Sequence, residues 1–113
     1  MNNFRGEFEV KLGGKTYKAK MSMNSLRMMC NQEGVELNDL YEHMAKEPMT
    51  AVCQMTFHAI KNYALLNGVD SGLPSFDAFC AQALDSVEQF EYMSKMVMEQ
   101  LAPDEEDEDS KKA

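Results

Sequence analysis

Apolar and polar residues alternate along residues 4–12 and 15–21, on both sides of Gly13-Gly14. A period of two is typical of a strand with one buried face, and a glycine pair permits the positive φ angles of a two-residue turn. We therefore predict a β-hairpin over residues 4–21. Its inward face would consist of Phe8, Val10, Leu12, Tyr17, Ala19 and Met21. A lone hairpin is marginal in water, so this face must pack on helices.

The apolar spacing then changes to the three-and-four pattern of amphipathic helices. We predict one helix from a cap at Asn24 to about Glu33, and a second from a cap at Asn38 to about Glu47, stopped by Pro48. The buried faces would be Leu26, Met29 and Cys30 in the first helix and Leu37, Leu40, Tyr41 and Met44 in the second.

The stretch 49–67 is apolar nearly all round, which predicts a central helix. After a loop over 68–74, Ser75 can cap a further helix. Its aligned apolar residues are Phe76, Phe79, Cys80, Ala83 and Leu84. Ser86 and Gln89 have the spacing of a capping box, so a last helix is predicted over 87–101.

These elements predict an α+β fold: one domain over residues 1–102, in which the hairpin packs on about five helices within 24–102. After Pro103, residues 104–113 carry six acids and two lysines. With no apolar residue except Ala113, the segment 103–113 should be a disordered acidic tail.

Composition narrows the function classes. The 113 residues carry a net charge of −8, which argues against nucleic acid as a partner. No apolar run is long enough to span a membrane, and the polar N-terminus has no apolar signal core. The three widely spaced cysteines, Cys30, Cys53 and Cys80, fit a reduced cytoplasmic setting rather than a disulfide framework.

The sequence contains little that supports a catalytic, cofactor-binding or metal site, and we expect none of the three. His43 and His58 lack a Cys or His partner at helical spacing, so we interpret both as partly exposed polar residues. A cysteine hydrolase that uses Cys30, Cys53 or Cys80 stays open as an alternative, because catalytic triads assemble in space. Asp70-Ser71 loosely resembles the phosphopantetheine site of carrier proteins, although Gly72 follows where that family has leucine.

Eleven methionines, most of them on predicted helices, stand out in the composition. Methionine packs against irregular or changing apolar surfaces, which favours a protein-binding function. Met29, Met44 and Met55 are expected in the core. The face of the last helix is wider than a core stripe, so part of it either lies between two helices or receives a partner. The predicted partner-binding residues are Met28, Met93, Met96, Val97, Met98 and Leu101.

The N-terminal sequence resembles the small tail assembly chaperones of long-tailed phages, prophages and gene transfer agents. The resemblance rests on the glycine-paired hairpin, on Asn24-Ser25-Leu26-Arg27 and on Gly34-Val35-Glu36-Leu37. The hairpin residues concerned are Phe4-Arg5-Gly6-Glu7-Phe8-Glu9-Val10-Lys11-Leu12-Gly13-Gly14-Lys15-Thr16-Tyr17. About 45 residues are covered, and beyond them only helical pattern and size agree.

The resemblance implies a non-enzymatic protein of the host bacterial cytoplasm that is absent from the mature virion. Its partners would be the tape-measure protein and, as a second candidate, the tail-tube protein. Such families often make a longer frameshifted product, and the wide face of the last helix allows self-association. The alternatives left open are a small acidic chaperone for another client and a DNA-mimic inhibitor that uses the acidic tail.

Overall fold

The structure is a computed structural model that describes residues 6–101. The predicted acidic tail 103–113 and the first residues of the predicted hairpin, Phe4 and Arg5, lie outside the described residues. Strands β1 (Glu7–Leu12) and β2 (Lys15–Lys20) form an antiparallel hairpin. Gly13 and Gly14 form its turn with φ angles of 57° and 77°, a conformation that glycine adopts without strain. The six predicted inward residues are all buried, so the hairpin prediction is confirmed.

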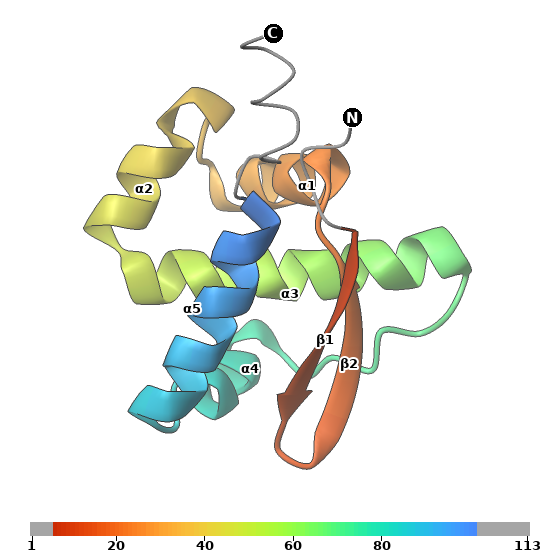
Figure 1. Ribbon diagram of the computed structural model, residues 1–113. Coiled ribbons are helices and arrows are strands. Elements are labelled where there is room, and N and C mark those ends of the chain that lie inside the picture. The colour runs from red at the N-terminus through yellow and green to blue at the C-terminus, as the bar shows by residue number, and fades with distance from the viewer. Residues whose placement is uncertain (1–5, 102–113) are drawn as a thin grey trace, which may run out of the picture.

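Five α-helices and one 3₁₀ helix follow within the described residues. They are α1 (Met23–Glu33), the 3₁₀ helix η1 (Leu37–Asp39), α2 (Leu40–Lys46), α3 (Pro48–Asn67), α4 (Phe76–Ala83) and α5 (Val87–Leu101). The predicted α+β fold, with a hairpin packed on helices, is therefore correct. Figure 1 shows α3 running through the centre, with the hairpin and α5 beside each other across it.

Helix α3 supplies more of the core than any other element because it is buried on several faces. Every residue from Ala51 to Thr56 is buried, as are Ala59, Ile60 and Ala64 further along. Pro48 is the first residue of this helix, where its missing N–H would have no helical partner anyway. Aromatic contacts attach α4 to α3, because the Phe57 ring lies 5.2 Å from that of Phe76 and 5.3 Å from that of Phe79.

A buried amide joins α3 to the connection between the hairpin and α1. Asn62 is fully buried, and its Nδ2 donates to the Lys20 carbonyl at 3.0 Å and to Ser22 Oγ at 3.2 Å. Its Oδ1 accepts from Asn24 Nδ2 at 2.8 Å. Because the side chain uses both ends of its amide, it fixes where β2 ends and where α1 begins.

The start of α1 and the buried face of α2 differ from the predictions. Ser22, not Asn24, caps α1 in a capping box with Ser25, and the Asn24 side chain instead donates to Asn62 and accepts from Arg27. In the α2 region only Leu40 is buried. Leu37 is 47% exposed and Tyr41 69% exposed, because α2 packs mainly on α3 along one narrow line.

The last two helices follow the predicted bounds with two local differences. Ser75 caps α4 and Ser86 Oγ accepts from the Gln89 N–H, as expected. The Gln89 side chain, however, reaches the Lys11 carbonyl instead of completing the capping box. Val87, the first residue of the predicted last helix, is 71% exposed, so the buried face of α5 does not extend to its first turn.

Replacing Asn62 with alanine should lower the free energy of unfolding by about 3 kcal/mol, since buried partners lose their hydrogen bonds. Urea unfolding followed by circular dichroism measures this change. Asn67→Ala is the matched control on the same helix, because the Asn67 amide bonds only to the exposed Tyr63 carbonyl. Equal, small losses for both variants would contradict the role given to Asn62.

Candidate functional site

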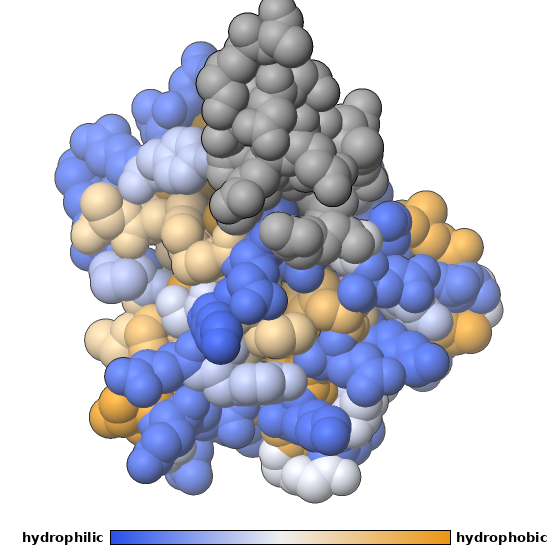
Figure 2. All heavy atoms as spheres, viewed as in Figure 1, coloured by the Kyte–Doolittle hydropathy of each residue, from blue (hydrophilic) through white to orange (hydrophobic). Residues whose placement is uncertain are grey.

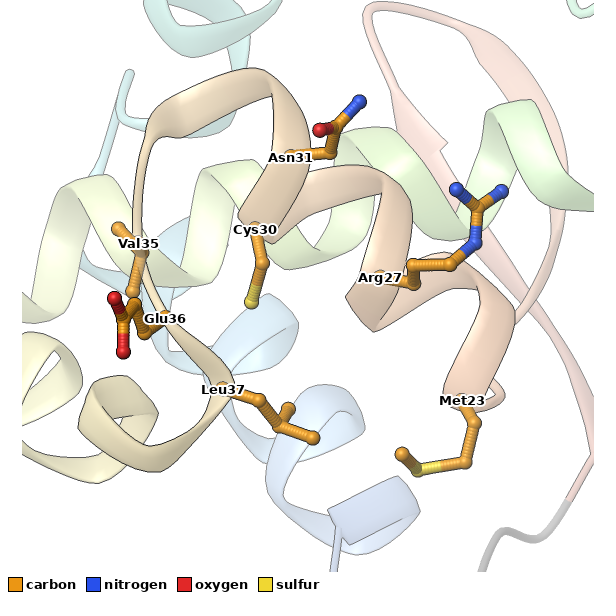
Figure 3. Close-up of a pocket in the computed structure, with 7 residues that line it drawn as sticks. All are labelled: Met23, Arg27, Cys30, Asn31, Val35, Glu36 and Leu37. Atoms are coloured by element: carbon orange, nitrogen blue, oxygen red, sulfur yellow. The ribbon is translucent and has the colours of Figure 1, made fainter.

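An apolar groove of about 380 Å³ lies between α1 and the segment that leads into η1. Figure 3 shows the seven lining residues, of which four belong to α1. The side chains of Met23 and Leu37 extend toward one another, and the sulfur of Cys30 points into the space between them. Met23 is 54% exposed and Leu37 47% exposed, so the groove presents large apolar side chains to solvent. The lining residues are Met23, Arg27, Cys30, Asn31, Val35, Glu36 and Leu37.

The groove follows from how α1 begins and ends. With Ser22 as the cap, Met23 falls in the first turn, and Arg27 and Cys30 follow at helical spacing on the same face. Gly34 ends the helix in the left-handed conformation, with φ of 72°. The N–H groups of Gly34 and Val35 both donate to the Cys30 carbonyl, which turns the chain back beside α1.

Two charged side chains flank the apolar lining. Arg27 is exposed on α1, where its Nε donates to Asn24 Oδ1 at 3.0 Å, and Glu36 is exposed on the returning segment. The remaining donors of the guanidinium point away from the ribbon in Figure 3. An apolar centre with opposite charges on its two sides suits an amphipathic helix better than a small charged ligand.

Two of the six predicted partner-binding residues are not on the surface. Met93 and Val97 are fully buried, because α5 packs on α3 through them. Met28, Met96 and Leu101 are half-buried, and Met98 is 47% exposed. None of the six lines the groove on α1. The C-terminal end of α5, however, lies close to α1 in Figure 1 and beside Leu37 and Met23 in Figure 3.

The sequence interpretation missed Met23 and Leu37 for identifiable reasons. The prediction of Asn24 as the cap leaves Met23 outside the helix. The pair Ser22 and Ser25, at capping-box spacing, was the signal that would have placed it in the first turn. The spacing of Leu37 predicts that it lies on a buried helix face. Spacing alone, however, does not say whether a neighbouring element covers that face.

The cysteines do not have the environment of nucleophiles. Burial, reinforced by the neighbouring Cys80, raises the pKa of Cys53 to about 12. Burial also raises the pKa of Cys30 and of Cys80. Since the thiolate is the nucleophile, these shifts oppose the reactivity that a cysteine hydrolase needs.

Both histidines are more engaged than predicted. His43 Nε2 lies 2.7 Å from Gln54 Oε1, a contact that joins α2 to α3. His58 is 2% exposed, not partly exposed, because α3 is covered on that side by α1. Its Nε2 lies 3.6 Å from Glu33 Oε2, and its Nδ1 is buried without a hydrogen-bond partner.

Other chemistry considered from the sequence is placed as follows. Ser71 Oγ accepts from the Leu73 N–H and Asp70 Oδ1 from the Gly72 N–H, which is turn geometry in a loop. Within residues 6–101, no group of three or more His, Cys, Asp or Glu side chains is arranged to hold a metal ion. The helices in this range also include none with the length and apolar character to cross a membrane.

The chain matches no protein-family model, no curated protein and no solved structure.

Acidification should destabilise the fold through His58. Burial lowers the pKa of His58, with the charge of Lys61 acting in the same direction and the hydrogen bond to Glu33 opposing it. Below the ordinary value of about 6.5, the unfolded chain binds a proton that the folded protein does not. The contribution of His58 to the free energy of unfolding is therefore complete above that pH, and it decreases as the pH falls toward the lowered pKa. Urea unfolding measured from about pH 7.5 to about pH 5 gives the free energy of unfolding on both sides of that ordinary value. This free energy should depend less on pH for His58→Gln than for the wild type.

Cys53 should react with iodoacetamide only when the protein unfolds, because its thiol stays protonated at neutral pH. Peptide mass spectrometry after brief labelling, with and without urea, measures this. Rapid labelling of native Cys53 would restore the cysteine hydrolase alternative.

Proposed function

We propose that this protein is a non-enzymatic binding protein whose α1 groove holds an apolar helical segment of a client. The observation that carries the proposal is the groove itself, in which Met23 and Leu37 are exposed around an apolar centre. Large apolar side chains kept at the surface of a concave site are typical of protein-binding sites.

The client that we propose is the tape-measure protein of a phage tail, with the tail-tube protein as a second partner. Two of the three segments that resemble the tail assembly chaperones contribute to the groove. Arg27 comes from the segment 24–27, and Val35, Glu36 and Leu37 come from the segment 34–37. Four of the seven lining residues thus lie in segments that carry the resemblance, which supports this client over an unrelated one.

The physical role follows from what such a client would need. A long, apolar, coiled-coil-prone protein aggregates unless its apolar faces are covered during assembly. Methionine suits a surface that must accept several segments of different shape, because its side chain is flexible and polarizable. The net charge of −8 would oppose association between loaded complexes. We place this activity in the host cytoplasm, before the virion is complete.

Affinity purification tests the proposal directly. The tagged protein is purified from cells that carry its own gene neighbourhood, and the proteins that come with it are identified by mass spectrometry. A long helical tape-measure-like protein or a tail-tube subunit is the expected partner. Recovery of a nuclease, polymerase or repressor instead would overturn the chaperone proposal and favour a DNA mimic.

Charge introduced into the groove should weaken client binding without unfolding the protein. Met23→Glu and Leu37→Glu should each lower the affinity for the recovered client at least about tenfold, as expected when a central apolar contact is lost. Val87→Glu is the control, because Val87 is an exposed apolar residue outside the groove. Isothermal titration calorimetry measures the affinities, and thermal melts verify folding. Equal losses in all three variants would remove the groove from the mechanism.

A further inference from the structure

The outer edge of β1 is covered by another element of the protein, and within the described part of the chain the outer edge of β2 keeps unpaired backbone groups. On the β1 side, Tyr92 Oη donates to the Glu9 carbonyl at 3.1 Å and Gln89 Nε2 donates to the Lys11 carbonyl at 3.4 Å. Both donors belong to α5, which lies along this edge in Figure 1. Helix α5 therefore covers the β1 edge, a common way to prevent pairing with another strand.

The β2 edge keeps its hydrogen-bonding groups available. Glu9 is opposite Lys18 and Lys11 is opposite Thr16 in the hairpin register. When a pair of this kind does not exchange hydrogen bonds, its two residues direct their N–H and C=O groups to opposite outer edges. Since Glu9 and Lys11 face α5, Lys18 and Thr16 face outward from β2. Within residues 6–101, no hydrogen bond reaches these outward groups of Thr16 or Lys18.

A groove of about 180 Å³ lies beside this edge. Thr16, Tyr17 and Lys18 line it on the strand side, and Ile60, Tyr63 and Ala64 line it on the α3 side. The loop after α3 borders it through Asp70, whose Oδ1 accepts from the Gly72 N–H, and through Ser71. Lys15 Nζ holds that loop by donating to the Gly72 carbonyl at 2.9 Å. Figure 1 shows this loop passing beside β2. A backbone placed in the groove would meet unpaired strand groups on one side and a largely apolar helix face on the other.

More apolar surface lies at the same end of α3. Leu65 and Leu66, which follow the groove residue Ala64, are 65% and 59% exposed, and Val69 is 54% exposed. Figure 2 shows apolar surface at the right-hand edge of the molecule, where Figure 1 places the C-terminal end of α3. None of these three residues lines the groove, so this surface lies at the end of α3 outside it.

The charge of β2 selects the kind of strand that can pair with it. Lys18 and Lys20 point to the solvent face of β2 in a protein whose net charge is −8. On the paired edge, β1 places Glu9 opposite Lys18 and Glu7 opposite Lys20, while its apolar residues face the core. Lysines on an edge strand also keep two copies of β2 apart, because like charges would lie side by side.

We propose that the free edge of β2 binds an extended peptide segment of another protein by strand addition, and that acidic and apolar residues alternate in this segment. Its backbone hydrogen-bonds with Thr16 and Lys18, its acids lie beside Lys18 and Lys20, and its apolar residues cover the α3 side of the groove. This site is separate from the α1 groove, so the proposal does not depend on the proposed function.

Hydrogen exchange in the full-length protein tests the site. The probes are a synthetic peptide of alternating glutamate and valine and a matched peptide of alternating lysine and valine. The acidic peptide should slow exchange of the Thr16 and Lys18 amide protons, as measured by NMR, and the basic peptide should not. Equal protection by both peptides, protection elsewhere in the protein, or no protection would overturn the proposal.

Substitution at Thr16 tests the backbone contact separately from charge. Thr16→Pro removes the outward N–H but no hydrogen bond of the hairpin, and an edge strand tolerates proline there. Thr16→Pro should weaken binding of the acidic peptide about tenfold, because one backbone hydrogen bond is lost and the proline ring prevents close approach of the peptide. Thr16→Ala should bind like the wild type. Equal binding by both variants would overturn the proposal. If circular dichroism shows that Thr16→Pro does not fold, the exchange experiment on the wild type decides alone.

Discussion

The arrangement of this protein depends on the buried side-chain amide of Asn62. Its three hydrogen bonds reach the Lys20 carbonyl, Ser22 Oγ and Asn24, which belong to the end of β2 and the first turn of α1. A buried amide without these partners would cost several kcal/mol (about 2 or more), so alternative placements of the hairpin are penalised. Apolar packing supplies most of the stability, but it is not directional. Asn62 adds the direction that packing lacks.

Both candidate binding surfaces follow from the position that Asn62 fixes. Where α1 begins determines that Met23 faces outward above Leu37, and so determines the groove on α1. The same amide satisfies the Lys20 carbonyl at one end of the β2 edge and leaves Thr16 and Lys18 open. One buried residue therefore sets the geometry of two separate surfaces, one suited to a helix and the other to an extended chain.

Local pattern was sufficient for the elements and insufficient for the surfaces. Alternation around Gly13-Gly14 predicted the hairpin correctly because strand period and turn chemistry are both local. The prediction of Asn24 as the cap is wrong because serine and asparagine both cap well and Ser22 takes that position. The Asn24 side chain instead donates to Asn62, 38 positions further along the chain. Likewise, the spacing of Met93 and Val97 does not distinguish a helix face covered by α3 from a face open to a partner. The groove on α1 forms because the chain turns at Gly34 and brings Leu37 back beside α1, an arrangement that helical spacing does not describe.

The cover that α5 provides for β1 has a consequence for the synthesis of the chain. Glu9 leaves the ribosome early. Tyr92, whose hydroxyl donates to the Glu9 carbonyl, is 83 positions further along the chain. Until α5 has been made, the hairpin has two open edges instead of one, and the apolar face of α3 that receives Met93 and Val97 is also uncovered. The nascent chain is therefore most prone to aggregate just before its last helix emerges.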